Sequence, residues 1–532
     1  MSDDLAAGST DRAGGAAGSR KPGRGGGRAG HAKRADGHAI SQMPWRIPVN
    51  HDRPTEPIGP DGVAAIHKGA MRILKEIGIR FLNDEALALF RKAGCKIEGQ
   101  TVFMDEDFVM EMVGRSPERF TITPRNPDRT LPIGDRHLLF GNVSSPPNYW
   151  DLRRGKVPGF MDGFRDFIKL TQYFNCIHFA GGYPVEPVDV HPSVRHLECV
   201  YEKLVLTDKV IHAYSLGRER IEDAMEMVRI AGGLTPEEFR ASPRMFTNIN
   251  SVSPLKHDHP MIDGALRCAR AGQVVIVTPF TLAGAMAPVT MSGAVTLSIA
   301  EALSAIALIQ YAAPGAPCMI GTFTSNVDMK SGAPAFGTPE YMRATQMTGQ
   351  MARFYKLPLR SSGVCAANVP DGQSMWETSN SLWAAVQSGT HMVYHAAGWL
   401  EGGLIASPEK FVMDCEVLQM IQRYMEPATW ATAPEDLAIS TIAEVGPEGH
   451  YFGCQHTQDR YSTAFYAPFA SDWRNYEAWQ ADGGLWTAER AHKIAGAILA
   501  DFTPPPMDEG RREELAAFVA RRKAEGGAPT DF

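Results

Sequence analysis

The sequence lacks the short motifs that most often reveal a cofactor or catalytic site. No GxGxxG or GxxxxGK(S/T) pattern follows a β-like run, so a loop that binds phosphate groups is not indicated. The HExxH and GxSxG motifs are also absent, so the sequence shows neither the common signature of zinc peptidases nor that of serine hydrolases. A metal or a phosphate-bearing cofactor bound by the chain itself is therefore not expected.

Paired cysteines and an excess of positive charge are missing as well. The eight cysteines contain no CxxC pair, which disfavours a thiolate zinc site and fits free thiols in a reducing cytoplasm. The formal net charge is -7 and the pI is about 6.2, whereas a nucleic-acid partner needs a basic face. We therefore expect a small-molecule substrate.

One uncharged run, residues 271–300, is long enough to cross a bilayer. Pro279, Pro288 and several glycines divide it into shorter pieces, which predicts a buried strand, a loop and a helix. No membrane span is expected.

The composition divides the chain into three regions. Residues 1–43 are rich in Gly, Ala and Arg with few large apolar side chains, which predicts a disordered tail. Residues 44–160 combine helical patterns with short β-like runs and predict an α+β extension. Residues 161–532 predict a TIM barrel followed by C-terminal helices.

The barrel is predicted from short apolar strands that alternate with helices of 10 to 20 residues. The strand candidates are CIHFAGG, KVIHAY, MFTNINS, VVIVTPF, APCMIGTF, LPLRSS and HMVYHAAG, with a weaker eighth in LAISTIAEV. Helices are expected at 191–206, 217–232, 259–271, 291–312, 339–355, 371–388 and 408–425. Because no dinucleotide fingerprint accompanies these units, a closed (β/α)8 barrel is favoured over an open sheet.

The active site of such a barrel lies at the carboxyl ends of its strands. The residues there are mostly aromatic and uncharged, and ring faces suit a quaternary ammonium better than an anion. Ordinary packing is the commoner role for any single one of these rings, and a structural role is likewise commoner than that of a base or ligand for His395 and His456. Asp371 is placed to cap the helix that contains Gln373 and Glu377.

Several long segments, in order, resemble the trimethylamine methyltransferase family. They are SPLKHDHPMIDGAL, the stretch from TPFTLAGAMAPV to CMIGTF, DMKSGAPAFGTPEY, VPDGQSMWE, GGLIASPEKFVMD and EVGPEGHYFGCQHT. The resemblance runs from about residue 45 to the C-terminus. It implies a TIM barrel that moves a methyl group from a methylated amine to Co(I) of a separate corrinoid protein, which docks over the barrel mouth. The corrinoid then belongs to the partner.

The sequence departs from the family at one informative place. Trimethylamine enzymes of the family carry pyrrolysine in the loop that corresponds roughly to GVCAAN, where this chain has Val364, Cys365 and Ala366. Members without pyrrolysine are similar to enzymes of glycine betaine and related compounds, so the resemblance implies a quaternary amine as methyl donor.

Under this interpretation we assign roles by residue type. Aromatic cage walls are expected from Tyr183, Tyr214, Phe280 and Phe323. Groups that hold a substrate carboxylate or hydroxyl are expected among Asn250, Gln373, His395 and His456. Glu377 places negative charge near the ammonium. Two alternatives stay open: a binding protein or sensor without catalysis, and a barrel lyase or isomerase that uses a histidine base. A homo-oligomer is expected for a chain of this size.

Overall fold

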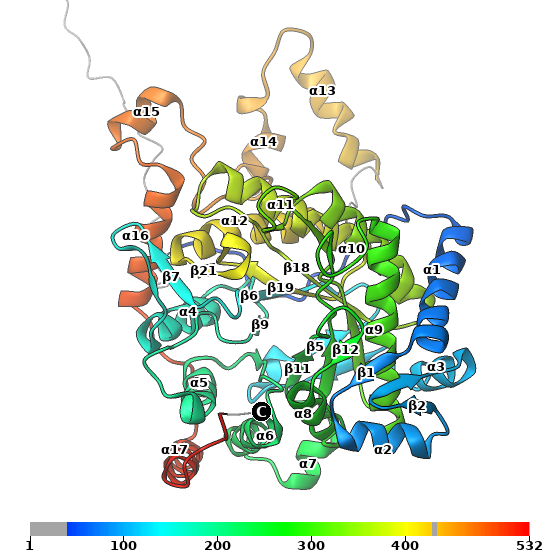
Figure 1. The fold of residues 1–532 in the computed structure, drawn as a ribbon. Coiled ribbons are helices and arrows are strands. Elements are labelled where there is room, and N and C mark those ends of the chain that lie inside the picture. Colours follow the sequence, from blue (N-terminus) through cyan, green and yellow to red (C-terminus); the bar gives the residue numbers. More distant parts are fainter. Residues whose placement is uncertain (1–39, 428–432, 531–532) are drawn as a thin grey trace, which may run out of the picture. The chain divides into compact units, whose positions relative to one another are not determined.

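The computed structural model describes residues 40–427 and 433–530 of the chain (Figure 1). The predicted disordered tail falls almost entirely outside these residues. At the centre of the described part lie eight parallel strands, which follow one another in chain order. They are β6 (Leu139–Asn142), β9 (Phe179–Ala180), β10 (Val210–Ile211), β11 (Phe246–Ile249), β13 (Val274–Val277), β15 (Cys318–Gly321), β18 (Leu359–Ser362) and β19 (Met392–Ala397).

The eight strands close into a barrel. β19 pairs with β6, β6 pairs with β9, and the ring is completed where His212, just after β10, bridges to Phe246 of β11. A helix follows each strand and packs outside it, which confirms the predicted (β/α)8 fold. These helices are α4 (Met161–Tyr173), α5 (Pro192–Leu206), α6 (Arg218–Gly232), α8 (His259–Arg270), α9 (Met291–Ala312), α10 (Pro339–Phe354), α11 (Gly372–Ser388) and α12 (Pro408–Tyr424).

The seven main strand predictions and their helices are confirmed, but the predicted eighth strand is wrong. LAISTIAEV contains the short helix α13 (Ile439–Val445), in which Ile439 and Ile442 are exposed to solvent. The eighth strand of the barrel is instead β6, which lies before residue 160 and so within the region predicted to be the N-terminal extension. Its neighbours fix its place, because it forms parallel pairs with β19 on one side and with β9 on the other.

A hairpin closes the amino-terminal end of the barrel. Its strands are β4 (Phe120–Ile122) and β5 (Leu131–Ile133), whose apolar side chains pack against the first residues of the barrel strands. Trp45 joins the same cluster. The ammonium group of Lys209 is buried nearby and donates to three backbone carbonyls, so this cation is fully hydrogen-bonded.

The remaining elements cover the outside of the barrel or extend its loops. The N-terminal layer contains α1 (Pro60–Arg72), η1 (Ile73–Ile77), α2 (Asp84–Lys92), α3 (Glu106–Val113) and a small sheet of β1 (Ile79–Phe81), β2 (Lys96–Glu98), β3 (Thr101–Phe103) and β12 (Lys256–His257). The loops carry β7 (Asn148–Asp151), β8 (Gly155–Pro158), α7 (Pro236–Ala241), β14 (Leu282–Ala283), β16 (Ser325–Val327), β17 (Pro334–Ala335), β20 (Trp399–Leu400) and β21 (Ile405–Ala406).

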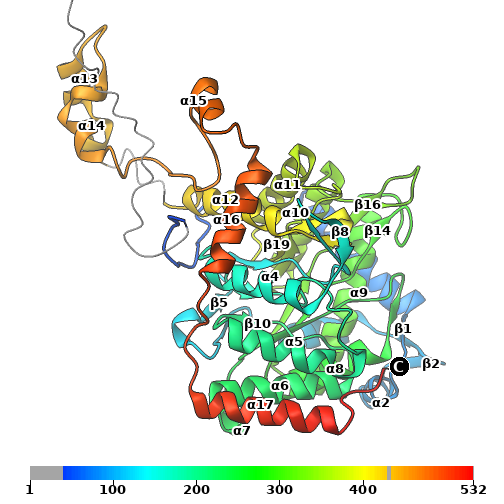
Figure 2. The same ribbon diagram turned by 90° about the vertical axis from the view of Figure 1, so that its left-hand side faces the viewer.

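Two predicted C-terminal helices are confirmed. α16 (Thr487–Ala500) packs on α12 and α4, and α17 (Glu509–Ala524) packs on α5 and α6, as Figure 2 shows. Two further short helices, α14 (Gln455–Arg460) and α15 (Tyr476–Ala481), precede them.

The uncharged run near residue 271 forms strand, loop and helix as predicted. It contains β13, β14 and the first half of α9. Of the described helices, α9 alone has the length and apolar character to cross a membrane, yet most of its surface is covered by other parts of the barrel.

A buried carboxylate fixes the loop that follows β11. Glu301 of α9 has no exposed surface and accepts hydrogen bonds from the hydroxyl of Ser251 at 2.5 Å, the hydroxyl of Ser253 at 2.6 Å and the backbone N–H of Leu255 at 2.6 Å. Burial raises the pKa of Glu301, and these three donors oppose that rise. The carboxylate thereby ties a loop at the carboxyl end of the barrel to a core helix.

We predict that Glu301→Ala lowers the free energy of unfolding by about 2 kcal/mol or more, because it leaves buried donors without an acceptor. Urea unfolding measures the change. Glu222→Ala on the exposed face of α6 is the control and should change the value by less than about 0.5 kcal/mol. Equal effects of the two substitutions would contradict the role assigned to Glu301.

Candidate active site

Aromatic and imidazole rings form a continuous series across the carboxyl end of the barrel, here called the mouth. Tyr183 and Tyr214, which follow β9 and β10, have ring centroids 4.7 Å apart. Phe280 and Phe323, which follow β13 and β15, are 5.0 Å apart. The rings that connect these two pairs, with successive centroids 4.9 to 5.9 Å apart, belong to His212, Tyr394 and His395. The structure thus brings the four predicted cage residues into one series with His395.

The hydroxyl of Tyr214 is held from three sides. It lies 2.9 Å from the hydroxyl of Ser144 and 2.6 Å from that of Ser145, and it accepts from the backbone N–H of Tyr183 at 3.1 Å. Burial raises the pKa of Tyr214, so the phenol stays neutral. These contacts orient the ring of Tyr214 at right angles to that of Tyr183.

An arginine that we did not predict lies within the series of rings. Arg360 of β18 is 3% exposed, and its guanidinium carbon lies 4.5 Å from the ring centre of Tyr394 and 5.6 Å from that of Phe323. Nη2 is 3.3 Å from Nε2 of His395, whereas Nε and Nη1 have no hydrogen-bond partner among residues 40–427 and 433–530. Among the described residues no carboxylate lies within 4.0 Å of this guanidinium.

The sequence predicted a mouth of mostly uncharged residues without an arginine, and the position of Arg360 shows that this prediction was wrong. Burial lowers its pKa to about 10, which still leaves the guanidinium protonated at neutral pH. The mouth therefore combines uncharged rings with one buried positive charge.

His395 and His212 are neutral imidazoles that present N–H groups. Burial lowers the pKa of both, and the charge of Arg360 lowers it further. Nε2 of His395 accepts from Arg360, and Nε2 of His212 accepts from the backbone N–H of Asn248 at 3.1 Å. In a neutral imidazole the proton is then on Nδ1. Neither Nδ1 has a partner in the described structure.

The backbone at His395 departs from a regular strand. His395 has φ +55°, and the pairing of β19 with β6 shifts register between Val393 and Ala397. Such an irregularity re-aims the side chain. It brings the His395 ring within 4.3 Å of the Trp399 ring, centroid to centroid.

Asn250 lies at the mouth as predicted, but its amide is already engaged. Its Nδ2 donates to the carbonyl of Thr278 at 2.7 Å, and the hydroxyl of Thr278 donates to Asn248 at 2.6 Å. These contacts connect the ends of β11 and β13. A role for Asn250 toward substrate stays a prediction.

The loop that corresponds to the pyrrolysine region is packed into the protein. Val364 and Cys365 have no exposed surface, and Ala366 is partly buried. The thiol of Cys365 donates to the carbonyl of Trp399 at 3.0 Å, and the indole N–H of Trp399 donates to the carbonyl of Cys365 at 3.2 Å. Burial raises the pKa of the Cys365 thiol to about 12, so it is not a nucleophile at neutral pH.

Glu377 holds this same loop. One carboxylate oxygen accepts from the backbone N–H groups of Ala366 at 2.8 Å and Ala367 at 3.0 Å, and the other accepts from the side chain of Gln373 at 2.9 Å. Asp371 caps α11 as predicted, accepting from the N–H of Ser374 at 3.1 Å. Glu377 and Gln373 are thus engaged in positioning the loop, and their roles toward substrate stay predictions.

His456 is not brought to the mouth by any contact in the described structure. It lies half-buried in α14, which packs against the short turn Tyr451–Gly453.

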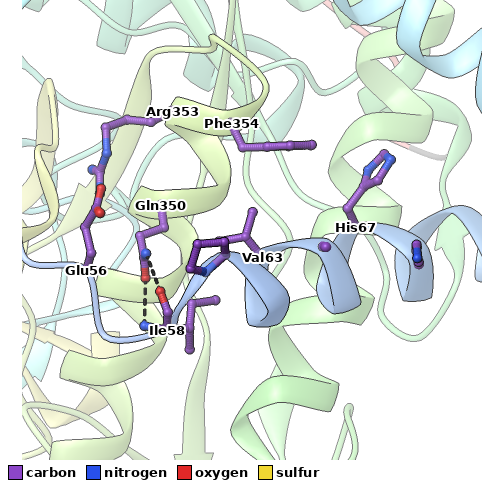
Figure 3. Close-up of a pocket in the computed structure, with 10 residues that line it drawn as sticks. Glu56, Ile58, Val63, His67, Gln350, Arg353 and Phe354 are labelled. Carbon is purple, nitrogen blue, oxygen red and sulfur yellow. Dashed lines mark hydrogen bonds and ion pairs between the residues drawn. The ribbon is translucent and has the colours of Figure 1, made fainter.

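The hollow in Figure 3 also lies away from the mouth. It is lined by α1, α10 and the segment before α1, where the side chain of Gln350 bonds the backbone of Ile58. None of the predicted site residues lines it.

No sequence pattern identified Arg360 as a residue of the mouth. Residues 357–362 are all buried, so this run shows no alternation between buried and exposed positions that would mark Arg360 as facing the interior. The partners of Arg360 come from other parts of the chain, around β15 and β19, and no local pattern connects them with it.

Apolar side chains are exposed on loops around the mouth. Eight of them lie between a barrel strand and the helix that follows it, after β6, β9, β11, β13, β15, β18 and β19, and the ninth lies near the start of α11; they are Leu152, Phe160, Val188, Val252, Val289, Met329, Val369, Leu404 and, in α11, Trp376. We call these residues the apolar rim. A rim of this kind is typical of a surface that contacts another macromolecule.

The chain is similar to known methyltransferases along most of its length. Residues 24–527 match the family described as trimethylamine methyltransferase (MTTB). A glycine betaine methyltransferase of Desulfitobacterium hafniense (strain Y51) is 35% identical over 468 residues, which cover 88% of this chain and 97% of the relative. The trimethylamine methyltransferase MttB of Methanosarcina thermophila is 26% identical and covers 85% of this chain and 94% of its own.

The solved structure of the monomethylamine methyltransferase MtmB of Methanosarcina barkeri is also similar to this chain. It is 11% identical, with a TM-score of 0.47, over 91% of this chain and 89% of that one.

We predict that the buried histidines make the protein less stable in acid. The pKa of His395 is lower in the folded protein than its usual value near 6.5, so the unfolded chain binds a proton that the folded protein excludes. The contribution of neutral His395 to the free energy of unfolding is fully present above pH 6.5 and is lost as the pH falls below that value. His395→Asn should make the dependence shallower by up to about 1.4 kcal/mol per pH unit.

Urea unfolding at pH 7.5, 6.5, 5.5 and 5.0 measures this slope. His450→Asn, at an exposed position, is the matched control and should leave the slope unchanged. The prediction is wrong if His395→Asn and wild type show the same slope.

Proposed function

The chain belongs to the trimethylamine methyltransferase family, and on this basis we propose that it moves a methyl group from a quaternary amine to Co(I) of a separate corrinoid protein. Glycine betaine or a related betaine is the proposed donor. The observation that carries the proposal is the 35% identity to a glycine betaine methyltransferase along 97% of that relative.

The loop at Val364 to Ala366 supports a donor that is already charged. Pyrrolysine is expected to capture and orient trimethylamine in relatives that carry it, whereas here Val364 and Cys365 have no exposed surface and the thiol of Cys365 donates to the carbonyl of Trp399. No side chain of this pair extends into solvent to take that role. A quaternary ammonium needs no such capture, because its methyl groups are electrophilic as they stand.

The rings of the mouth support recognition of that ammonium. Tyr183, Tyr214, Phe280 and Phe323 present aromatic faces within one series of contacts. A trimethylammonium group cannot donate a hydrogen bond from N–H, so attraction to ring faces and exclusion of water are the interactions that bind it.

The proposed reaction is a direct displacement. The N–CH3 bond breaks as a Co–CH3 bond forms, and the electron pair of the broken bond stays on nitrogen to give a neutral tertiary amine. The electron pair of the new bond comes from Co(I). The chain contributes alignment of one methyl group with the acceptor and a site that excludes water. A general base is not required, which agrees with the depressed pKa of His395.

The apolar rim supports a macromolecular acceptor. It surrounds the mouth on loops from most of the barrel units, and a docked corrinoid protein would cover it. A free small-molecule acceptor would leave these side chains in water.

A cytoplasmic location is part of the proposal, because all eight cysteines are unpaired thiols. A homo-oligomeric state stays a prediction.

We expect the purified chain, mixed with a Co(I) corrinoid protein and glycine betaine, to form methylcobalt and dimethylglycine. Absorbance spectra and mass spectrometry measure the two products. Proline betaine, carnitine, choline and trimethylamine are offered in parallel, and trimethylamine should give no product. Tight binding of a betaine without methyl transfer, with several corrinoid proteins, would favour the sensor, and proton or bond rearrangement of the donor would favour a lyase or isomerase.

We expect charges in the apolar rim to weaken transfer to the corrinoid protein without weakening donor binding. Val289→Glu and Met329→Glu each change a side chain that is about 70% exposed, so the fold should be unaffected. The KM for the corrinoid protein should rise about tenfold, and the Kd for the donor should not change. Ile77→Glu, which is exposed on the N-terminal layer, is the control. A rise of the same size in the control would contradict the docking site.

A further inference from the structure

Arg360 is almost fully buried, and two of its three guanidinium nitrogens have no acceptor among the described residues. The described chain buries three lysines of comparable size, and each has partners: Lys203 donates to the carbonyls of Gly181 and His212, Lys209 to three carbonyls, and Lys410 to Asp414 and Thr378. Arg360 differs from them, since its Nε and Nη1 have no acceptor in the part of the chain that the structure describes.

A buried charge without an acceptor is costly, so folded proteins pair or hydrogen-bond such groups. Stacking on Tyr394 and Phe323 fixes the plane of the guanidinium but satisfies none of its N–H groups. The contact with His395 satisfies one nitrogen, and the imidazole is neutral. A negative group from outside the chain would satisfy these N–H groups and neutralise the charge.

Further donors lie around the same place. The hydroxyl of Tyr394 and the Nδ1–H groups of His395 and His212 are buried, and no described residue is their hydrogen-bond partner. The rings of all three belong to the series that includes Arg360's stacking partners. Since an ionised carboxylate only accepts hydrogen bonds and carries the opposite charge, it complements this set.

We infer that Arg360 binds the carboxylate of a zwitterionic quaternary amine, so that the enzyme requires an acid group on its methyl donor. This inference rests on the proposed function and narrows its substrate class. Arg360 attracts the carboxylate and repels the ammonium, which orients the donor with its methyl groups away from the guanidinium. Tyr183, Tyr214 and Phe280, which have no ring contact with Arg360, are the faces that then receive the ammonium.

The same arrangement rejects donors that lack the acid. Choline carries the same trimethylammonium group but presents a hydroxyl in place of the carboxylate, so its binding leaves the charge of Arg360 uncompensated. A site built for a charged hydrogen-bonding group discriminates strongly against ligands that lack it.

Calorimetric titration of the full chain with glycine betaine, choline and sodium acetate tests the inference without any corrinoid. Wild type should bind glycine betaine about 10- to 100-fold more tightly than choline, the range for charged hydrogen bonds. Acetate should compete weakly, because it supplies only one half of the ligand. Arg360→Met should abolish the preference and leave choline binding unchanged or improved, and Arg360→Lys should retain part of it.

Arg125→Met is the matched control. Arg125 also has two nitrogens without partners, but it is half-buried after β4, at the opposite end of the barrel, and faces the charge of Asp208. Its replacement should leave the preference intact. The melting temperature of Arg360→Met should not fall, because the substitution breaks no ion pair.

The inference is overturned if wild type binds choline as tightly as glycine betaine, if acetate binds as tightly as glycine betaine, or if Arg360→Met keeps the preference. Failure of the proposed function looks different. In that case the wild type shows the Arg360-dependent preference in binding but forms no methylcobalt with any corrinoid protein.

Discussion

Closure of the strand ring between β10 and β11 is the constraint on which the rest of the structure depends. These two strands meet through a single bridge from His212 to Phe246 and a hydrogen bond from Ala213 to Phe246. A closed ring of parallel strands sends all eight carboxyl ends to one face. Residues as distant in sequence as Tyr183 and His395 therefore share a site. His212 contributes to both tasks, since its backbone closes the ring and its imidazole lines the mouth.

The repeating part of the fold could be predicted because its strands are fully buried and separated by regular helices. Such strands form short apolar runs, and parallel pairing requires a crossover of this length. β6 was assigned to the N-terminal extension and not to the barrel, because a hairpin of β7 and β8 stands between it and α4, so no helix directly follows the run. LAISTIAEV was misassigned because a short apolar run fits a strand as well as a helix.

The site could be predicted in part, for a related reason. The ends of β9, β10, β13 and β15 are predictable once the strands are known, and so the place of Tyr183, Tyr214, Phe280 and Phe323 at the mouth was predicted, whereas their roles toward substrate stay predictions. Arg360 needed the register of β18 relative to its neighbours, and the turn of His395 toward it depends on a positive φ that no sequence pattern indicates. Glu377 was expected to face the ligand, whereas the structure shows it engaged with the backbone of the loop before α11.

The position of Arg360 shows how stability and binding are divided within the barrel. Elements around the mouth are satisfied by internal partners: Glu301 ties down the loop after β11, Glu377 holds the loop after β18, and Lys203 joins the ends of β9 and β10. These contacts stabilise the fold around the mouth. The protein can therefore tolerate the unfavourable free energy of the unpaired N–H groups of Arg360. In a methyl donor that carries both charges, the carboxylate pairs with Arg360 while the ammonium contacts the aromatic rings. The acid group then provides orientation, and the ammonium end, held only by ring faces, is left free to present a methyl group to the acceptor.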